Sequence, residues 1–309
     1  MKISIITPSY NQGQFIERTL LSVAKQTGGE IEHVVFDGNS SDNTVEVLKQ
    51  NAELVRWVSE ADKGQTDAVN KGIRATSGEI IGWLNSDDIY YPGAIATVLE
   101  FFEKNPEIDI IYGMADHIDI NDMPFETYPS EPWDFERLKE TCFICQPALF
   151  FRRRLVAKYG LLDESLNYCM DYEFWLRLGK AGVKFAYLEK KLAGSRLYAD
   201  NKTLGAKVKV HYEINEMFRK KFGKVPNKWL LGYSHAIVES KIDRKKYPAR
   251  YTYSLLKPLI HSSFHWNKNL NFDLIKIILG WGLRLLILKP LSIGLGHARN
   301  IQKKFKAAD

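Results

Sequence analysis

The chain has 309 residues and the composition of an ordinary globular protein, with 45% hydrophobic and 26% charged residues. Its three cysteines are too few, and odd in number, for a disulfide framework, so we expect a reducing compartment. The net charge of +6 is unevenly divided: residues 202–309 contain 22 Lys and Arg against 6 Asp and Glu, whereas residues 1–201 contain 21 against 31. This division predicts an acidic module that could hold a cation and a basic module that faces something anionic.

The first 112 residues alternate between strand and helix patterns. Apolar, strand-like runs occupy residues 3–7, 31–36, 54–58, 80–84 and 108–112. Between the first two runs, Ile16, Leu20, Val23 and Ala24 recur at the spacing of one helix face. Strands that alternate with helices predict an α/β fold with a mostly parallel sheet and helices on both of its faces.

Polar residues follow three of these runs: residues 8–11 after the first, 37–42 after the second and 85–88 after the fourth. The carboxyl ends of parallel strands lie at one edge of a sheet, where ligands bind and where loops carry function. We therefore expect these three loops to form one polar rim.

The rest of the chain is more mixed. A helix is predicted over residues 171–181, and after Lys202 the pattern is helical and basic, which divides the chain into a catalytic domain, 1–204, and a helical basic extension, 205–309. A strand pattern begins directly after Met1 without the apolar region of a signal peptide, so the expected location is cytoplasmic. Neither a Gly-rich dinucleotide fingerprint nor a P-loop occurs, which disfavours both of those nucleotide-binding classes.

Asp87 and Asp88 form the first candidate site. Two adjacent carboxylates on a turn repel each other unless a positive charge lies beside them, and Mg²⁺ or Mn²⁺ with phosphate oxygens can supply that charge. The structural alternative is a helix cap, since Pro92 follows shortly. These residues alone leave both interpretations open.

Two further carboxylates also have two interpretations. Asp37 could accept a hydrogen bond from a base or a ribose hydroxyl, or it could form a turn with Gly38 and Asn39. Asp171 could act as a general base toward an acceptor hydroxyl, or it could be favoured only by the dipole at the start of its helix. Taken singly, the structural interpretation is the stronger for both.

Cys142 and Cys145 form a single Cys-x-x-Cys in an apolar run. No second pair and no nearby His completes a zinc site, so we interpret these cysteines as buried thiols without a chemical role.

In combination, these features resemble the family 2 glycosyltransferases of the GT-A fold. Seven short stretches carry the resemblance, in the order of the family: SIITPSYN at residues 4–11, SVAKQT at 22–27, FDGNSSDNT at 36–44, DKGQTDAVNKG at 62–72, GWLNSDD at 82–88, QPA at 146–148 and MDYEFWLRL at 170–178. Each stretch is weakly specific, but seven in the right order are not. The resemblance covers about residues 1 to 205.

The resemblance implies an inverting glycosyltransferase that uses a nucleotide diphosphate sugar, with UDP-sugars favoured, and a divalent cation, Mn²⁺ or Mg²⁺. It also implies roles for individual positions: nucleotide binding for Thr7, Pro8, Tyr10, Asp37, Asp67, Ser86 and Asp87, metal binding for Asp87 and Asp88, and general-base catalysis for Asp171. Asp171 would take the proton of the acceptor hydroxyl as it attacks the anomeric carbon, while the metal neutralises charge on the departing diphosphate.

Two positions depart from the family pattern. Asn85 stands where the family has the first Asp of its Asp-x-Asp motif, so metal ligation would fall on Asp87 and Asp88. Tyr198 stands where many relatives have a His that helps to hold the metal or the diphosphate. Lys202 is a candidate to replace that function.

The acceptor implied by the resemblance is a glycan or a lipid-linked glycan, in the synthesis of cell-surface polysaccharide. A metal-dependent nucleotidyltransferase is an alternative, although the loop at residues 8–13 lacks the Lys or Arg that a triphosphate needs. A non-catalytic scaffold that binds sugar nucleotides is another alternative. Asn85 and Tyr198 support it, whereas Asp87, Asp88 and Asp171 oppose it.

The basic extension contains an apolar segment, residues 272–295, that charged residues interrupt. Its longest uncharged stretch, residues 277–283, is far shorter than the ~20 residues that a spanning helix needs. We predict an interfacial amphipathic helix that binds an anionic membrane surface through Trp281, Leu285, Leu286 and Ile287 beside Arg284 and Lys289, on the inner face of the cell membrane. A helix packed on the catalytic domain is the alternative, and a nucleic-acid partner is not expected.

Overall fold

The computed structural model describes residues 1–198, 201 and 205–283. Contacts between Cα atoms divide the chain into two compact units, with the division between Gly205 and Ala206. The candidate Lys202, the predicted boundary after residue 204 and the predicted membrane-facing residues beyond 283 lie outside the described residues.

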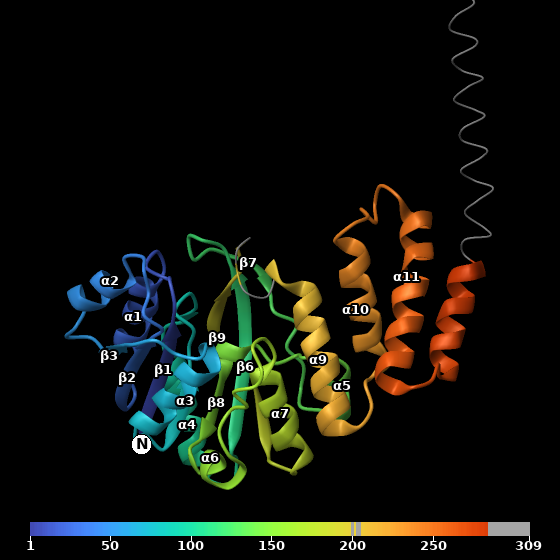
Figure 1. Cartoon of the computed structure of the whole chain (residues 1–309). Helices are drawn as coiled ribbons and strands as arrows, with labels where there is room; N and C mark the ends of the chain where they lie inside the picture. Colours follow the sequence, from blue (N-terminus) through green and yellow to red (C-terminus); the bar gives the residue numbers. More distant parts are fainter. Residues whose placement is uncertain (199–200, 202–204, 284–309) are drawn as a thin grey trace, which may run out of the picture. The chain divides into compact units, whose positions relative to one another are not determined.

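One sheet organises the first unit (Figure 1). Its nine strands among the described residues are β1 (Lys2–Ser9), β2 (Glu30–Asp37), β3 (Arg56–Ser59), β4 (Ile80–Trp83), β5 (Ile89–Tyr90), β6 (Ile110–Ile118), β7 (Pro124–Thr127), β8 (Leu149–Arg152) and β9 (Phe185–Arg196). The order across the sheet is β3-β2-β1-β4-β8-β6-β9-β5, and β7 pairs with β6. The five predicted runs correspond to β1, β2, β3, β4 and β6, the last of which continues to Ile118.

The sheet is parallel in its first part and mixed beyond it. β1 is parallel to both β2 and β4, and β2 is parallel to β3. β8 is antiparallel to β4 and to β6, β5 is antiparallel to β9, and β6 is parallel to β9. The predicted α/β fold is confirmed, and the predicted parallel pairing holds for β1 to β4, whereas the sheet as a whole is mixed.

Helices cover both faces of the parallel part. The helices of the first unit are α1 (Ile16–Ala24), α2 (Thr44–Gln50), α3 (Gln65–Ala75), α4 (Ala94–Lys104), α5 (Phe135–Glu140), α6 (Arg154–Tyr159) and α7 (Met170–Lys180), with a 3-10 turn η1 (Gln146–Ala148). Ile5 of β1 lies in the core cluster that includes α4, whereas Ile6, on the opposite face, contacts α3. A Cβ on Gly72 of α3 would lie 2.3 Å from Ile6 Cγ2, so only glycine permits this close approach.

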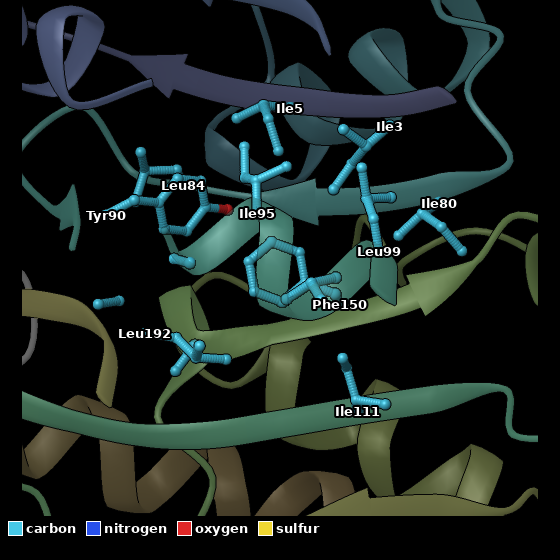
Figure 2. Close-up of a cluster of buried hydrophobic side chains, with 14 of the residues drawn as sticks. Ile3, Ile5, Ile80, Leu84, Tyr90, Ile95, Leu99, Ile111, Phe150 and Leu192 are labelled. Atoms are coloured by element: carbon cyan, nitrogen blue, oxygen red, sulfur yellow. The ribbon is translucent and has the colours of Figure 1, made fainter. Parts of the chain in front are cut away.

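The main core of the first unit lies between α4 and the centre of the sheet (Figure 2). Ile5 of β1, Ile80 of β4, Ile95 of α4 and Phe150 of β8 are all fully buried in it. Full burial of such a side chain contributes about 1.5–3 kcal/mol. Leu84 belongs to the same cluster, so the core anchors the chain immediately before the loop that carries Asp87.

A smaller core lies under α1. Ile16 and Leu20 pack there with Val35 and Leu48, as the spacing of the sequence predicts. Ala24, at the end of the predicted stripe, is exposed instead. The helix ends at this residue, so its last position has no neighbouring element to pack against.

The second unit is helical in its described part, which confirms that prediction. It consists of α9 (Lys207–Phe222), α10 (Asn227–Glu239), α11 (Pro248–Ser262), a π-helical turn η2 (Ser263–Asn267) and a helix over residues 272–283. Among the described residues, no helix combines the length and the apolar character needed to cross a membrane.

Candidate functional site

A buried polar pair lies beneath the ends of β1 and β2. Thr7 Oγ1 is hydrogen-bonded to His33 Nε2 at 3.0 Å, and Thr7 has no exposed surface. Burial lowers the pKa of His33 to about 3, so the imidazole is neutral at physiological pH. Because the Thr7 hydroxyl is occupied inside the sheet, the predicted nucleotide contact of Thr7 would have to use its backbone.

The loop after β1 is hydrogen-bonded to the loop after β2. The N–H of Asn11 donates to Ser40 Oγ at 2.8 Å, and the N–H of Gln12 donates to Thr44 Oγ1 at 2.9 Å. Pro8 is buried, whereas the Tyr10 side chain is 62% exposed. A rigid backbone thus presents an exposed aromatic ring, which is suited to packing against a planar base.

Asp37 lies at the end of β2 and is 2% exposed. Its carboxylate accepts hydrogen bonds from the N–H of Ser40 at 2.9 Å, from Ser40 Oγ at 2.5 Å and from Ser59 Oγ at 2.6 Å. A carboxylate has about four acceptor positions. The structure therefore holds Asp37 in one orientation and leaves it with capacity for one further donor, such as a base N–H.

Asp67 lies in the first turn of α3 and is also buried. It accepts a hydrogen bond from the N–H of Lys63 at 3.1 Å and lies 3.4 Å from Lys71 Nζ. Burial alone would raise the pKa of Asp67, but the Lys63 hydrogen bond and the Lys71 charge outweigh it and lower that pKa. These contacts give Asp67 a structural role at the start of α3, and its nucleotide contact stays a prediction.

Asn85 is the centre of a hydrogen-bond network after β4. Its Oδ1 accepts from Gln65 Nε2 at 2.7 Å and from Trp83 Nε1 at 2.9 Å. Its Nδ2 donates to Asp88 Oδ2 and to Gln146 Oε1, both at 3.1 Å. A carboxylate could not donate these last two bonds. The residue that departs from the family motif thus fits its position, because this network needs an amide.

Asp87 is half-buried beside Tyr198. The Tyr198 hydroxyl donates to Asp87 Oδ2 at 3.0 Å and accepts from Gln12 Nε2 at 3.2 Å. Burial raises the pKa of Asp87, and the Tyr198 hydrogen bond partly opposes this increase. Gln12, Tyr198 and Asp87 therefore connect the end of β1 with the end of β4.

Asp88 points into the protein. It is 2% exposed, and its Oδ1 accepts from the N–H of Arg196 at 2.8 Å while its Oδ2 accepts from Asn85. Burial and the neighbouring charge of Asp87 raise the pKa of Asp88 well above its usual range. Ser86 is buried as well, and its carbonyl accepts from Thr19 Oγ1 at 3.0 Å.

Arg196, at the end of β9, holds this loop in place. It is 1% exposed, its Nε donates to the carbonyl of Asp87 at 2.7 Å, and its guanidinium pairs with Asp122. The guanidinium carbon lies 4.7 Å from the centre of the Phe15 ring. A buried charge with this many partners fixes the position of the backbone at Asp87.

Asp171 lies in the first turn of α7, close to the segment of Cys142 and Cys145. Burial, followed by the charge of Asp88, raises the pKa of Cys145, and Asp171 contributes to the same increase. Asp88 and Asp171 therefore both lie near the segment of residues 142–145. Cys145 and Cys169 are buried, all three cysteines are free, and the raised pKa of the Cys142 and Cys145 thiols makes these two poor nucleophiles.

A metal ion would find few carboxylates here. Among the described residues, no group of three or more His, Cys, Asp or Glu side chains could hold a metal. Within the described part of the chain, Asp87 has only Tyr198 as a side-chain donor, whereas both Asp88 oxygens already have donors. The Gln12 Oε1 atom is buried without a hydrogen-bond partner among the described residues. Asp87 thus fits a cation that arrives with phosphate oxygens, which needs one or two carboxylates, and Asp88 is less suited to be a ligand.

The sequence interpretation did not identify several residues of this site. Gln12, Gln65, Gln146 and Arg196 position the loop that carries Asp87, although none received a role. Gln65 and Gln146 lie within the stretches that carry the family resemblance, which was the available signal. Arg196 stands at the Arg of the Arg-x-His pattern that many relatives have, in which Tyr198 replaces the His, so the resemblance gave a signal there as well.

Residues 4–160 match the family model described as Glycosyl transferase family 2. The chain and an uncharacterized glycosyltransferase of Nostoc sp. are 28% identical over 231 residues. The alignment covers 67% of this chain and 68% of that protein. The chain is 27% identical to the chondroitin synthase of Escherichia coli over 69% of this chain and 32% of the synthase. It is 29% identical to the hyaluronan synthase of Pasteurella multocida over 69% of this chain and 22% of the synthase. The match thus spans less than a third of either synthase.

Two solved structures have a similar fold. S. aureus TarS 1–349 in complex with UDP-GlcNAc has a TM-score of 0.59 and 15% identity, over 85% of this chain and 81% of that one. The mannosyltransferase PcManGT from Pyrobaculum calidifontis, in complex with GDP-Man and Mn²⁺, has a TM-score of 0.56 and 17% identity, over 93% and 81%. At these identities, the similarity concerns the fold.

Proposed function

The chain belongs to glycosyltransferase family 2 and is a glycosyltransferase, and from this premise we propose that its polar rim transfers a sugar from a UDP-sugar to an acceptor hydroxyl with inversion at the anomeric carbon. The observation that carries the proposal is the connection from Gln12 through the Tyr198 hydroxyl to Asp87. It joins the ends of β1 and β4, and the loop after β1 is hydrogen-bonded to the loop after β2. The complex of TarS with UDP-GlcNAc supports UDP as the first nucleotide to test.

The nucleoside would lie across the ends of β1 and β2. Tyr10 offers an exposed ring for the base, and Asp37 offers one free acceptor position for a base or ribose donor. Pro8 and Thr7 would contribute backbone, since their side chains are buried. Ser9 Oγ is buried without a hydrogen-bond partner among the described residues, which adds a polar group to the same edge.

The diphosphate would lie at Asp87. A divalent cation bound there would neutralise the charge that develops on the departing nucleoside diphosphate. Asp87 offers a carboxylate oxygen for this purpose. We propose that Asp88, Asn85 and Arg196 position the loop that carries Asp87. This role differs from the sequence prediction that Asp88 is itself a metal ligand.

Asp171 would supply the general base. As the acceptor oxygen forms its bond to the anomeric carbon, the bond from that carbon to the diphosphate oxygen breaks, and the acceptor proton passes to the Asp171 carboxylate. A single displacement of this kind inverts the anomeric configuration and needs no covalent nucleophile. This is consistent with the buried cysteines, since the raised pKa of the Cys142 and Cys145 thiols keeps them protonated.

The acceptor would be a glycan or a lipid-linked glycan of a cell-surface polysaccharide. The chondroitin and hyaluronan synthases among the relatives support polysaccharide synthesis. Because this chain corresponds to only a part of those synthases, the resemblance does not specify which sugars or linkages this chain uses.

The reaction is tested with a panel of nucleotide sugars in the presence of Mn²⁺ or Mg²⁺. We expect one donor to raise the melting temperature, because a ligand that binds only the native state stabilises it. With that donor, the enzyme should release nucleoside diphosphate, and the rate of release should increase when the glycan acceptor is added. The anomeric configuration of the product, measured by NMR, should be opposite to that of the donor. Retained configuration would exclude the single displacement, and pyrophosphate release from nucleoside triphosphates would indicate a nucleotidyltransferase instead.

The cation is tested separately by calorimetric titration with UDP. We expect tight binding with Mn²⁺, and weak binding after chelation or in Asp87→Ala. Asp88→Asn should keep most of the Mn²⁺ dependence, because Asp88 is oriented away from the ligand. Equal UDP affinity with and without Mn²⁺ would remove the cation from the proposal.

A further inference from the structure

The helix of residues 272–283 is apolar on two opposite faces. On one face, Leu274 is fully buried and Trp281 packs against the core cluster of Val238, Tyr251 and Leu255. On the other face, four large apolar side chains are exposed by 37–69%: Phe272, Ile275, Leu279 and Leu283. At 3.6 residues per turn these four lie within an arc of about 80° that is opposite Leu274 and Trp281. We refer to these four residues as the outward face.

The outward face differs from the cluster that the sequence predicts. Trp281 was expected to contact the membrane, but it packs into the second unit, while Leu285, Leu286 and Ile287 lie outside the described residues. A helix that is apolar on two opposite faces normally has both faces covered. An exposed row of large apolar side chains therefore indicates an interaction surface.

A basic segment, residues 241–250, consists of the turn between α10 and α11 and the first residues of α11. We refer to it as the basic loop. Its five cations are all exposed: Lys241, Arg244, Lys245, Lys246 and Arg250. Its one carboxylate, Asp243, accepts hydrogen bonds from the backbone N–H groups of Lys245 and Lys246, at 2.7 and 3.0 Å. No ion pair links these five cations to a carboxylate of the described residues. The loop therefore presents positive charge that the described protein does not neutralise.

The basic loop lies next to the helix of the outward face. Ile242 of the loop and Trp281 of the helix pack against the same cluster, which contains Tyr251 of α11. The Arg244 guanidinium carbon lies 5.7 Å from the centre of the Tyr251 ring. In Figure 1 the helix of residues 272–283 (red) runs beside α11, in agreement with these contacts. Apolar and cationic side chains are thus neighbours on one part of the second unit.

We propose that the outward face and the basic loop form one docking surface for an anionic lipid bilayer. The apolar side chains would enter the boundary between headgroups and acyl chains, while the cations would meet the headgroup phosphates. Lys276 Nζ lies 4.3 Å from the centre of the Phe272 ring. If Phe272 enters the bilayer, the long Lys276 side chain can still extend its ammonium group to the headgroups.

Charge distinguishes this partner from the other candidates. Residues 206–283 contain 15 Lys and Arg against 5 Asp and Glu, so a dimer formed through this same surface of two copies would place two positive surfaces against each other. A nucleic acid would attract the basic loop, but it would leave the four apolar side chains in water. Of these three partners, only a bilayer provides both anionic and apolar groups. The proposal goes beyond the proposed glycosyl transfer and does not depend on it.

Flotation of the full-length chain with lipid vesicles tests the proposal. The vesicles are phosphatidylcholine alone, or phosphatidylcholine with about 30 mol% phosphatidylglycerol. We expect the chain to float with the anionic vesicles, and increasing the salt from about 0.05 M to about 0.5 M to weaken that binding through screening. Leu279→Glu should lower the partition coefficient by about 10- to 100-fold or more, since it removes one inserted side chain.

Matched variants separate the surface from general effects. Met123, at the turn between β6 and β7, is 62% exposed, as is Leu279, so Met123→Glu is the control for Leu279→Glu. The double variant Lys245→Glu with Lys246→Glu should weaken binding to anionic vesicles more than the double variant Lys49→Glu with Lys104→Glu. Lys49 and Lys104 are exposed on α2 and α4 of the first unit and cause the same change in net charge.

Four results would overturn the proposal. The first is that the chain fails to float at every lipid composition. The second is that Leu279→Glu and Met123→Glu bind vesicles equally. The third is a dimer in sedimentation that Leu279→Glu dissociates. The fourth is an oligonucleotide that prevents flotation and binds Leu279→Glu as tightly as the unmodified chain. Donor binding measured on the same variants should be unchanged, so a failure here is distinguishable from a failure of the proposed glycosyl transfer.

Discussion

The polar rim of the first unit and the basic loop of the second unit both concentrate charge, but in opposite environments. At the rim, Asp88 and Arg196 are almost fully buried, and each has several protein partners. In the basic loop, Lys245 and Lys246 are exposed and form no ion pair with the described residues. A buried charge is costly unless protein groups replace its water, whereas exposed charges act mainly through their sum. A single substitution at the rim should therefore have a large effect on stability or activity, whereas a single substitution in the basic loop should have a small one.

The largest effect is expected at Asp171. Asp171→Asn keeps the shape of the side chain but cannot accept the acceptor proton, so kcat should fall by ~10²–10⁴-fold while donor affinity is preserved. Steady-state kinetics and calorimetry measure the two quantities. Glu173→Gln is the control. Glu173 is fully buried and accepts hydrogen bonds from Arg177, so this change should lower the free energy of unfolding and leave kcat nearly unchanged. Near-normal turnover in Asp171→Asn would assign the base elsewhere.

Substitution of one arginine in each region tests the contrast between the buried charges of the rim and the exposed charges of the basic loop. Arg196→Gln breaks a buried charge pair and should lower the free energy of unfolding by about 3–5 kcal/mol. Arg244→Gln changes an exposed side chain of the basic loop and should alter it by less than about 0.5 kcal/mol. Urea denaturation followed by circular dichroism measures both. Equal effects would contradict the contrast between the two regions.

A smaller effect is expected from His33 as the pH falls. Its folded-state pKa is about 3 and its unfolded pKa is about 6.5, so between these values only the unfolded state is protonated and stability decreases as the pH decreases. From pH 7 to pH 5 this group should remove about 2 kcal/mol of stability. His33→Gln keeps a hydrogen-bonding side chain beside Thr7 but cannot titrate, so it should make the unfolding free energy less dependent on pH in this range. An unchanged pH dependence would mean that His33 is not the responsible group.

The smallest effect is expected from Tyr198. Tyr198→Phe keeps the ring against Phe15 but removes the hydroxyl that joins Asp87 to Gln12. Loss of a group that only orients a ligand usually costs about 10- to 100-fold in affinity, and we expect about 10-fold for UDP with Mn²⁺. Tyr253→Phe, on an exposed tyrosine of the second unit, is the control. Unchanged UDP affinity in Tyr198→Phe would show that the connection does not support the site.

Much of the parallel part of the fold follows from local patterns. The apolar runs at β1, β2 and β4 and the stripe of Ile16, Leu20 and Val23 appear where the sequence predicts them, because a strand buried on both faces and an amphipathic helix have distinct periods. β8 and β5 were not predicted as strands. β5 has two residues and β8 four, and their antiparallel pairing depends on distant strands rather than on their own sequence.

The second unit illustrates the same limit. The apolar pattern of residues 272–283 predicts a helix, and the structure has one. Which side of that helix faces outward was not predictable, since apolar residues occupy both sides. The packing of Trp281 against the cluster that contains Tyr251 decides that Leu279 and Leu283 are the exposed residues.

The sequence by itself determined the family, the strand ends that carry polar residues, and the carboxylates Asp37, Asp87, Asp88 and Asp171, because these are short local motifs in a fixed order. Only the tertiary structure decided what each carboxylate contacts. It turns Asp88 toward Asn85 and Arg196, leaves Asp87 with Tyr198, and gives Asn85 four partners from three separate segments. Adjacent side chains such as Asp87 and Asp88 have the same chemistry in a sequence. Their burial and their hydrogen-bond donors, which come from residues as distant as Arg196 and Tyr198, make them different.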